Sequence, residues 1–457
     1  MKQQKLLGEE SIGNLLIKYS VPAIIGMLVN ALYNIVDRAF IGRIPDVGQL
    51  AITGVGITMP IAYILLAFGM LIGIGTTANM SIKLGQGKKK EVEKLIGNSL
   101  TLTIIIGVII TILGLVFVDP MLKAFGAGNN TLIFAKEYII IILLGSIFNL
   151  ISFSLNSTIR ADGSPKVAAT TMIIGCLLNT IMDPIFIFIF KWGIKGAALS
   201  TVLSQAIVTV IILYYYTKGK SNFKLKKENL KLDTNLVKCI LAIGVAPFSM
   251  QIAASVVQIV SNNALKLYGG DLAIGAMTVI SSISMIFMMP TFGINQGAQP
   301  IIGFNYGAKK YNRAKLTFKY ATIVACTILT IGFVLIRIFP EQCISIFNKD
   351  SALLNISIDG LKIYLCMMPL IGIQIVGSNY FQSIGKAKLS MFLSLLRQVI
   401  LLIPLILILP KAYGLTGIWL AGAMSDFIST IITIVFLVKE FKNESKENIT
   451  LVDSMVQ

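Results

Sequence analysis

The chain has 457 residues, of which 55% are hydrophobic and only 13% are charged, and its mean hydropathy is +0.82. A soluble protein averages about 25% charged residues, so this composition excludes a soluble enzyme and indicates a polytopic membrane protein. The formal net charge is +18 and histidine is absent, so proton transfer near neutral pH has to use carboxylates.

Twelve apolar stretches follow one another, each long enough to cross a hydrocarbon core of about 30 Å as a helix. Their approximate bounds are 18–42, 50–82, 95–118, 132–158, 167–190, 196–217, 237–266, 272–304, 316–338, 352–384, 389–409 and 414–438. This pattern predicts an all-α protein with twelve transmembrane helices.

The basic residues report the orientation of these helices. With the connections assigned to alternate sides, the side of both termini carries 27 lysines and arginines and the other side carries ten. The positive-inside rule therefore predicts cytoplasmic termini in the cell (plasma) membrane. Because the basic charge marks topology, we expect the lipid bilayer and no nucleic acid as a partner.

The second half of the chain repeats the first. Val21-Pro22 matches Ala246-Pro247 and Pro184 matches Pro404, at a shift of about 220–226 residues. Six helices per half is an even number, so the halves form a parallel repeat of two lobes, the arrangement used for alternating access. The predicted parts are an N-terminal lobe (1–217), a cytoplasmic basic linker (218–236), a C-terminal lobe (237–438) and a cytoplasmic tail (439–457).

Ionisable residues inside the spans are few, and each is a functional candidate because a charge at membrane depth costs at least a few kcal/mol. The helical rise places Asp37 and Asp183 about 25–28 Å from the cytoplasmic ends of their helices, in the outer half of the membrane. Asn179 lies one turn before Asp183, and Thr201 lies at a similar depth in the next span. These four oxygen-bearing residues suit Na⁺ as ligands, or a shared proton.

The same residues also have a purely structural interpretation. Asp37 could pair with Arg38 or Arg43, although adjacent residues point about 100° apart on a helix. Both arginines can extend to the outer headgroups. Arg397 and Asp426 could pair with each other or act in function.

Further polar or adaptable residues are candidates for lining a substrate cavity. The first helix has a polar stripe of Asn30, Tyr33 and Asn34, and the seventh helix has the amides Gln251, Gln258 and Asn262. Met288 is a further candidate, although a packing role is the safer interpretation for it.

Three motifs carry a resemblance to a known family. They are the stretch from Asn30 to Gly42 with Pro22 before it, the stretch from Arg160 to Lys166, and Asn179 with Asp183-Pro184. The chain resembles the multidrug and toxic compound extrusion (MATE) transporters, in particular the bacterial branch of MepA and DinF.

The resemblance implies a twelve-helix, two-lobe exporter of lipophilic, often cationic, drug-like compounds, driven by inward Na⁺ or H⁺ flow. It also implies that Asp37, Asn179, Asp183 and Thr201 form an N-lobe cation site. Some family members carry carboxylates in the seventh and tenth helices, where this chain has neutral amides. We therefore expect the N lobe to carry the coupling.

Two other functions compete with export. A flippase for a lipid-linked glycan has a related fold, and it tends to have a basic central cavity for phosphate. A membrane enzyme needs a clustered nucleophile, histidine or metal motif, and the sequence shows none. We expect a transporter without cofactor or catalytic residues that functions as a monomer.

Overall fold

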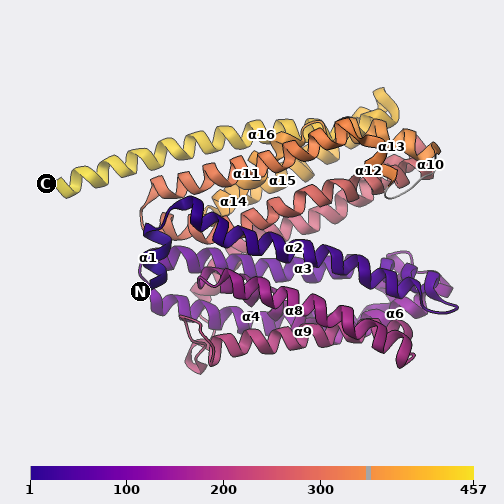
Figure 1. The fold of residues 1–457 in the computed structure, drawn as a ribbon, viewed down its shortest axis with the longest axis horizontal. Coiled ribbons are helices and arrows are strands. Elements are labelled where there is room, and N and C mark those ends of the chain that lie inside the picture. Colours follow the sequence, from indigo (N-terminus) through magenta and orange to yellow (C-terminus); the bar gives the residue numbers. More distant parts are fainter. Residues whose placement is uncertain (1, 346–350, 457) are drawn as a thin grey trace. The chain divides into compact units, whose positions relative to one another are not determined.

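The computed structural model describes residues 2–345 and 351–456 (Figure 1). All regular elements in these ranges are helical, which confirms the predicted all-α class. The elements up to the linker are α1 Lys2–Glu9, α2 Ile12–Gly42, α3 Gly48–Gly85, α4 Lys89–Val116, α5 Val118–Ala124, α6 Asn129–Leu144, α7 Ser146–Ala161, α8 Pro165–Pro184, η1 Ile185–Ile189, α9 Gly193–Thr217 and η2 Lys227–Leu230. Beyond the linker are α10 Thr234–Gly307, α11 Tyr311–Ile338, α12 Pro340–Ser345, α13 Ser351–Tyr364, α14 Met368–Ser383, α15 Ala387–Leu395, η3 Leu396–Leu402 and α16 Ile403–Val456.

The described helices account for the twelve predicted spans. Nine of them are long and apolar enough to cross a membrane, and two bent pairs, α6 with α7 and α13 with α14, raise the number to eleven. The last of these, Ala387–Glu444, has 58 residues and would be about 87 Å long as one straight helix. Gly414 interrupts it with a φ of 56°, a left-handed conformation that glycine adopts readily, so it contains two spans. The protein is a multi-pass membrane protein.

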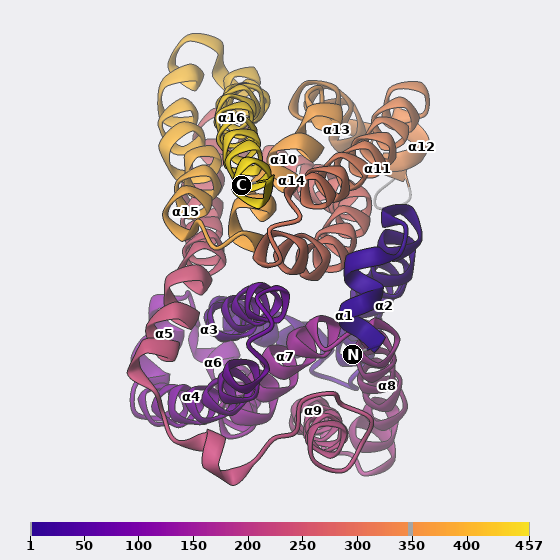
Figure 2. The ribbon, with the colours of Figure 1, turned by 90° about the vertical axis from the view of Figure 1, so that its left-hand side faces the viewer.

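The chain forms two compact units whose boundaries differ from those of the two sequence halves. Unit 2 comprises Ile25–Gln251, and unit 1 comprises Met1–Ile24 with Ile252–Gln457. Helices α2 and α10 therefore each begin in one unit and continue in the other. Within unit 2, α7 packs against α3, α4 and α9 (Figure 2).

Close glycine contacts hold the first turns of α10 in unit 2. A Cβ added to Gly244 would lie 1.7 Å from the carbonyl oxygen of Leu71, and one added to Gly75 would lie 2.1 Å from that of Ile240. Asn79 in α3 donates a hydrogen bond to the carbonyl of Cys239 at 2.9 Å. Small residues allow such close approach of helices in a membrane, where dispersion drives association.

The basic linker is attached to unit 2 at both ends. The Asp162 carboxylate accepts hydrogen bonds from the Ser221 hydroxyl at 3.0 Å and the Asn222 backbone N–H at 3.2 Å. Further on, the Asn98 side chain donates to the Lys231 carbonyl at 3.2 Å and accepts from the Asp233 N–H at 2.7 Å. Asp162 belongs to the Arg160–Lys166 motif, so this motif anchors the linker.

The contact between α3 and α10 predicts a site-specific stability loss. Gly244→Ala adds a methyl group where no space exists, and overpacking of this kind costs about 1–3 kcal/mol. Thermal unfolding of the purified protein in detergent should show a lower Tm. Gly13→Ala is the matched control, because nothing lies within 4 Å of its added Cβ. Equal Tm values for the two variants would contradict this packing.

The anchored linker predicts protection from proteolysis. Asn98→Ala removes the hydrogen bonds to the end of the linker, so trypsin should cleave the lysine-rich stretch 218–238 faster than in the parent. The cleavage rate is followed by mass spectrometry of the fragments. Asn14→Ala, an exposed position on α2, serves as the control and should leave the rate unchanged.

Candidate functional site

The candidate site lies in unit 2, where the C-terminal ends of α2 and α8 meet the N-terminal end of α9. An apolar cluster that includes Ile41, Val55, Ile187 and Ala197 packs α2, α3, α9 and η1, the segment that follows α8, together. Asp37 lies five residues before the end of α2. The packing fixes the ends of three helices, so the polar side chains beside it have defined positions.

Asp183 is fully buried and is surrounded by donors from α8 and α9. The Ser200 hydroxyl donates a hydrogen bond to its carboxylate. With the Asn179 amide nitrogen facing Asp183, it lies 2.9 Å from Oδ2, and the amide oxygen accepts from the Thr201 hydroxyl at 3.2 Å. Asn179 therefore connects the carboxylate of α8 to the hydroxyl groups of α9.

Asp37 adds a second carboxyl group to this cluster. Its side chain is 8% exposed and interacts directly with that of Asp183. Among the described residues, Asp37 Oδ1 has no hydrogen-bond partner, and neither aspartate forms an ion pair with a lysine or arginine. The structure therefore brings together Asp37, Asn179, Asp183 and Thr201, and the pairing of Asp37 with Arg38 or Arg43 is not found there.

The backbone beside Asp183 departs from an ordinary α-helix. Pro184 lacks an N–H, and the following segment Ile185–Ile189 is a π-helix. Such segments often occur at functional sites because they reposition the side chains of a helix. In the second half, Leu396–Leu402 is also a π-helix, just before the matching proline, Pro404.

Two residues of the cluster were missed in the sequence. Ser200 is fully buried and contacts Asp183, and the Tyr138 side chain of α6 lies beside that of Thr201. Ser200 could have been found as the neighbour of Thr201, on a helix that turns only 100° per residue. No sequence pattern indicated Tyr138, because its position beside Thr201 depends on how α6 packs against α9.

The matching region of the second half holds an ion pair. The Arg397 guanidinium donates to the Asp426 carboxylate, and the Ser425 hydroxyl donates to the Arg397 carbonyl at 2.5 Å. Asp426 is 4% exposed. Each charge neutralises the other, so of the two interpretations of Arg397 and Asp426 the structure shows the pairing.

The predicted cavity residues are divided between the units. Asn30, Tyr33, Asn34 and Gln251 belong to unit 2, whereas Gln258, Asn262 and Met288 belong to unit 1. Two pairs form hydrogen bonds within a helix: Asn34 donates to the Asn30 carbonyl at 2.7 Å, and Gln258 donates to Asn262 at 3.0 Å. Met288 packs against a core cluster of unit 1. Their role in substrate binding stays a prediction.

Comparison with known proteins now decides the family. The model of the MatE family matches residues 22–185 and again residues 248–408, once in each half of the chain. The chain belongs to the MATE family. The double match at a shift of about 225 residues is also the internal repeat seen in the sequence.

Curated relatives of this MATE protein include multidrug exporters. It is 25% identical over 445 residues to the multidrug export protein MepA of Staphylococcus haemolyticus, with 97% of each chain covered. It is 26% identical to MepA of Staphylococcus aureus (strain MRSA252), with 92% of this chain and 93% of that protein covered.

Solved structures share the fold. One is an outward-facing multidrug resistance MATE family transporter, with a TM-score of 0.91, 24% identity, and coverage of 98% of this chain and 99% of that one. Another is a MOP superfamily transporter from Pyrococcus furiosus with a binding pocket of reverse polarity. Its TM-score is 0.91 and its identity 24%, with 97% of this chain and 99% of that one covered.

The cluster predicts a measurable role for Ser200. Ser200→Ala removes a donor from the buried Asp183 carboxylate, and a buried acceptor that loses its partner costs about 1–3 kcal/mol. The Tm at neutral pH should fall. Ser204→Ala is the control, because that hydroxyl donates only to the Thr201 carbonyl of its own helix among the described residues. A fall of equal size in both variants would contradict the contact with Asp183.

Proposed function

We propose that this MATE protein is a secondary active multidrug efflux transporter of the plasma membrane, with both termini in the cytoplasm. It exports lipophilic, often cationic compounds by alternating access, driven by inward flow of Na⁺ or H⁺ through the site at Asp37 and Asp183. It acts as a monomer on drug-like molecules and needs no cofactor.

The contact between the two buried carboxyl groups carries this proposal. Two carboxylates this close cannot both be ionised without a positive charge between them. Because neither carboxylate forms an ion pair with a lysine or arginine within the described chain, a cation from outside the protein is needed to balance the second charge. The partnerless Asp37 Oδ1 is an oxygen ready for such a cation.

The available donors fit either coupling ion. Na⁺ is a hard cation that binds oxygen, and the two carboxylates, the Asn179 amide oxygen and the Thr201 hydroxyl are all oxygen ligands. A proton shared between Asp37 and Asp183 satisfies the same pair. In the described residues, no three or more His, Cys, Asp or Glu side chains gather as they would for a tightly bound structural metal.

Binding of the cation is expected to change the packing of three helices. Without it, repulsion between the carboxylates pushes α2 away from α8, and with it they are drawn together. An ion can shift the equilibrium between the separated and the close arrangement of α2 and α8 only if it binds one of them more tightly. The Asp37–Asp183 pair provides this difference, because it binds a cation best when the two carboxylates are close.

A lipid-linked glycan flippase is less well supported as an alternative function. Its basic cavity would need several free cationic side chains, and of the arginines within the predicted spans, Arg397 is neutralised by the ion pair with Asp426. The names of the two curated relatives, both multidrug exporters, favour drug export.

Transport measurements test the proposal. In proteoliposomes, export of a fluorescent cationic dye by the parent is measured with a sodium gradient alone and then with a proton gradient alone. The gradient that drives export identifies the coupling ion. Asp37→Asn and Asp183→Asn replace an ionisable oxygen by a neutral amide, so both should reduce export to the rate of empty liposomes.

The matched control is Asp46→Asn. Asp46 is an exposed aspartate between α2 and α3 with a φ of 63°, a conformation that asparagine also tolerates. It should export dye at the parental rate. Undiminished export by both site variants would falsify coupling through Asp37 and Asp183.

A further inference from the structure

Arg38 is a charged residue at membrane depth that the cation site does not use. It follows Asp37 on α2 but projects about 100° away around the helix, and it is exposed whereas Asp37 is buried. Among the described residues it forms no ion pair. Its one hydrogen-bond contact there is a weak one from Nη2 to the Met59 sulfur at 3.7 Å.

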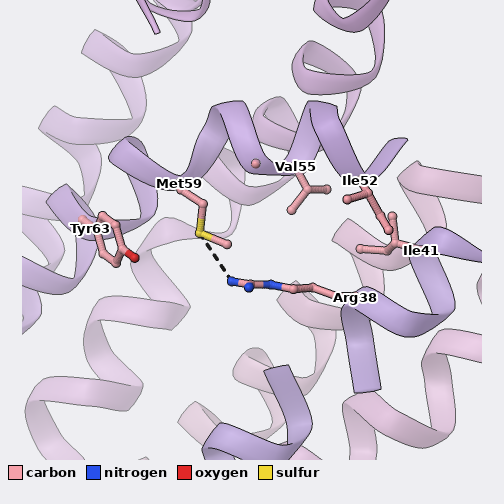
Figure 3. A pocket seen from close by; sticks show the side chains of 7 residues that line it. Arg38, Ile41, Ile52, Val55, Met59 and Tyr63 are labelled. Atoms are coloured by element: carbon pink, nitrogen blue, oxygen red, sulfur yellow. Dashed lines mark hydrogen bonds between the residues drawn. The ribbon is translucent and has the colours of Figure 1, made fainter. Parts of the chain in front are cut away.

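The Arg38 side chain extends along α3. Arg38 lies four residues before Gly42, the last residue of α2. Met59, which its guanidinium contacts, lies eleven residues after Gly48, the first residue of α3, or about 16 Å along that helix. The guanidinium therefore lies over the third turn of α3 and not at the connection between the two helices (Figure 3). That Arg38 reaches the outer headgroups stays a prediction.

A cavity of about 270 Å³ surrounds this side chain, between α2 and α3 of unit 2. Ile52 and Val55 line it as an apolar wall, and Tyr63 brings a hydroxyl group to its end beyond Met59 (Figure 3). An apolar pocket with a few polar groups that fix orientation is the usual form of a small-molecule site.

The chemistry of this cavity selects its ligand. The Arg38 guanidinium has no ion-pair partner among the described residues, and a guanidinium matches carboxylate and phosphate with two parallel hydrogen bonds. We infer that the cavity binds the oxyanion of an amphiphilic molecule: Arg38 binds its carboxylate or phosphate, and Ile52 and Val55 contact its apolar part. This rests on the proposed function and widens its cargo from cations to zwitterions and anions.

A matched pair of dyes tests the inference. Rhodamine 110 carries a free carboxylate, and rhodamine 123 is its methyl ester with the same ring system. Binding to the purified protein in dodecyl maltoside is measured by fluorescence anisotropy. Arg38→Gln should weaken binding of rhodamine 110 by about 10- to 100-fold, the usual value of a hydrogen bond to a charged group, and change that of rhodamine 123 less than about twofold.

Three further variants separate charge, shape and folding. Arg38→Lys keeps the charge and should recover part of the lost affinity. Gly56→Leu fills the cavity while Arg38 stays intact, and should weaken rhodamine 110 binding; its added Cβ has no neighbour within 4 Å. Arg43→Gln removes a nearby exposed arginine outside the cavity lining and should change nothing. Parental affinity for rhodamine 110 in both Arg38→Gln and Gly56→Leu would overturn the inference.

Competition distinguishes the two sources of the oxyanion. If phosphatidylglycerol displaces rhodamine 110 from the parent but phosphatidylcholine does not, and Arg38→Gln abolishes the difference, the site also takes a lipid phosphate. If neither lipid competes, the site prefers soluble carboxylates. Binding is measured without any gradient, so a failure of cation-driven export does not affect this result. Equal binding of rhodamine 110 by all variants would refute the role of Arg38 and would leave coupling through Asp37 and Asp183 untouched.

Discussion

Two carboxyl groups in contact inside a membrane-embedded lobe impose the constraint on which the rest of this protein depends. Asp37 and Asp183 come from different helices, so their repulsion acts directly on helix packing. Asn179 and Ser200 supply hydrogen bonds to Asp183, and Thr201 is hydrogen-bonded to Asn179, but none of these residues carries a positive charge. On the proposed function, the energy of this lobe depends on a cation, which is the property that a coupled transporter needs.

The internal repeat shows that one scaffold carries different chemistry in its two halves. Each half contains a π-helix beside a matching proline, and in each an apolar cluster packs the surrounding helices. Where the first half has Asp183 before Pro184, the second has Ile403 before Pro404. The buried Asp426 of the second half is already balanced by Arg397, so the repeat preserves the fold while the carboxylate pair without an ion-pair partner lies in the first half.

The helices that begin in one unit and continue in the other link the site to the rest of the chain. Asp37 lies near the C-terminal end of α2, and the first turns of the same helix belong to unit 1. Pro22 in α2 and Pro247 in α10 each lie within four residues of the point where their helix changes unit. Proline removes a backbone hydrogen bond, so both helices can bend there.

The sequence by itself determined the membrane class, the twelve spans, the repeat and the residues expected to meet at Asp183. These follow from hydrophobic length, charge bias and the 100° turn of a helix, which are local properties. Only the tertiary structure decided that Tyr138 joins the cluster, that Arg397 pairs with Asp426, and that Arg38 contacts Met59 while Asp37 is buried. Each of these depends on which helix faces which, and helix facing is decided by the packing of side chains distant in sequence.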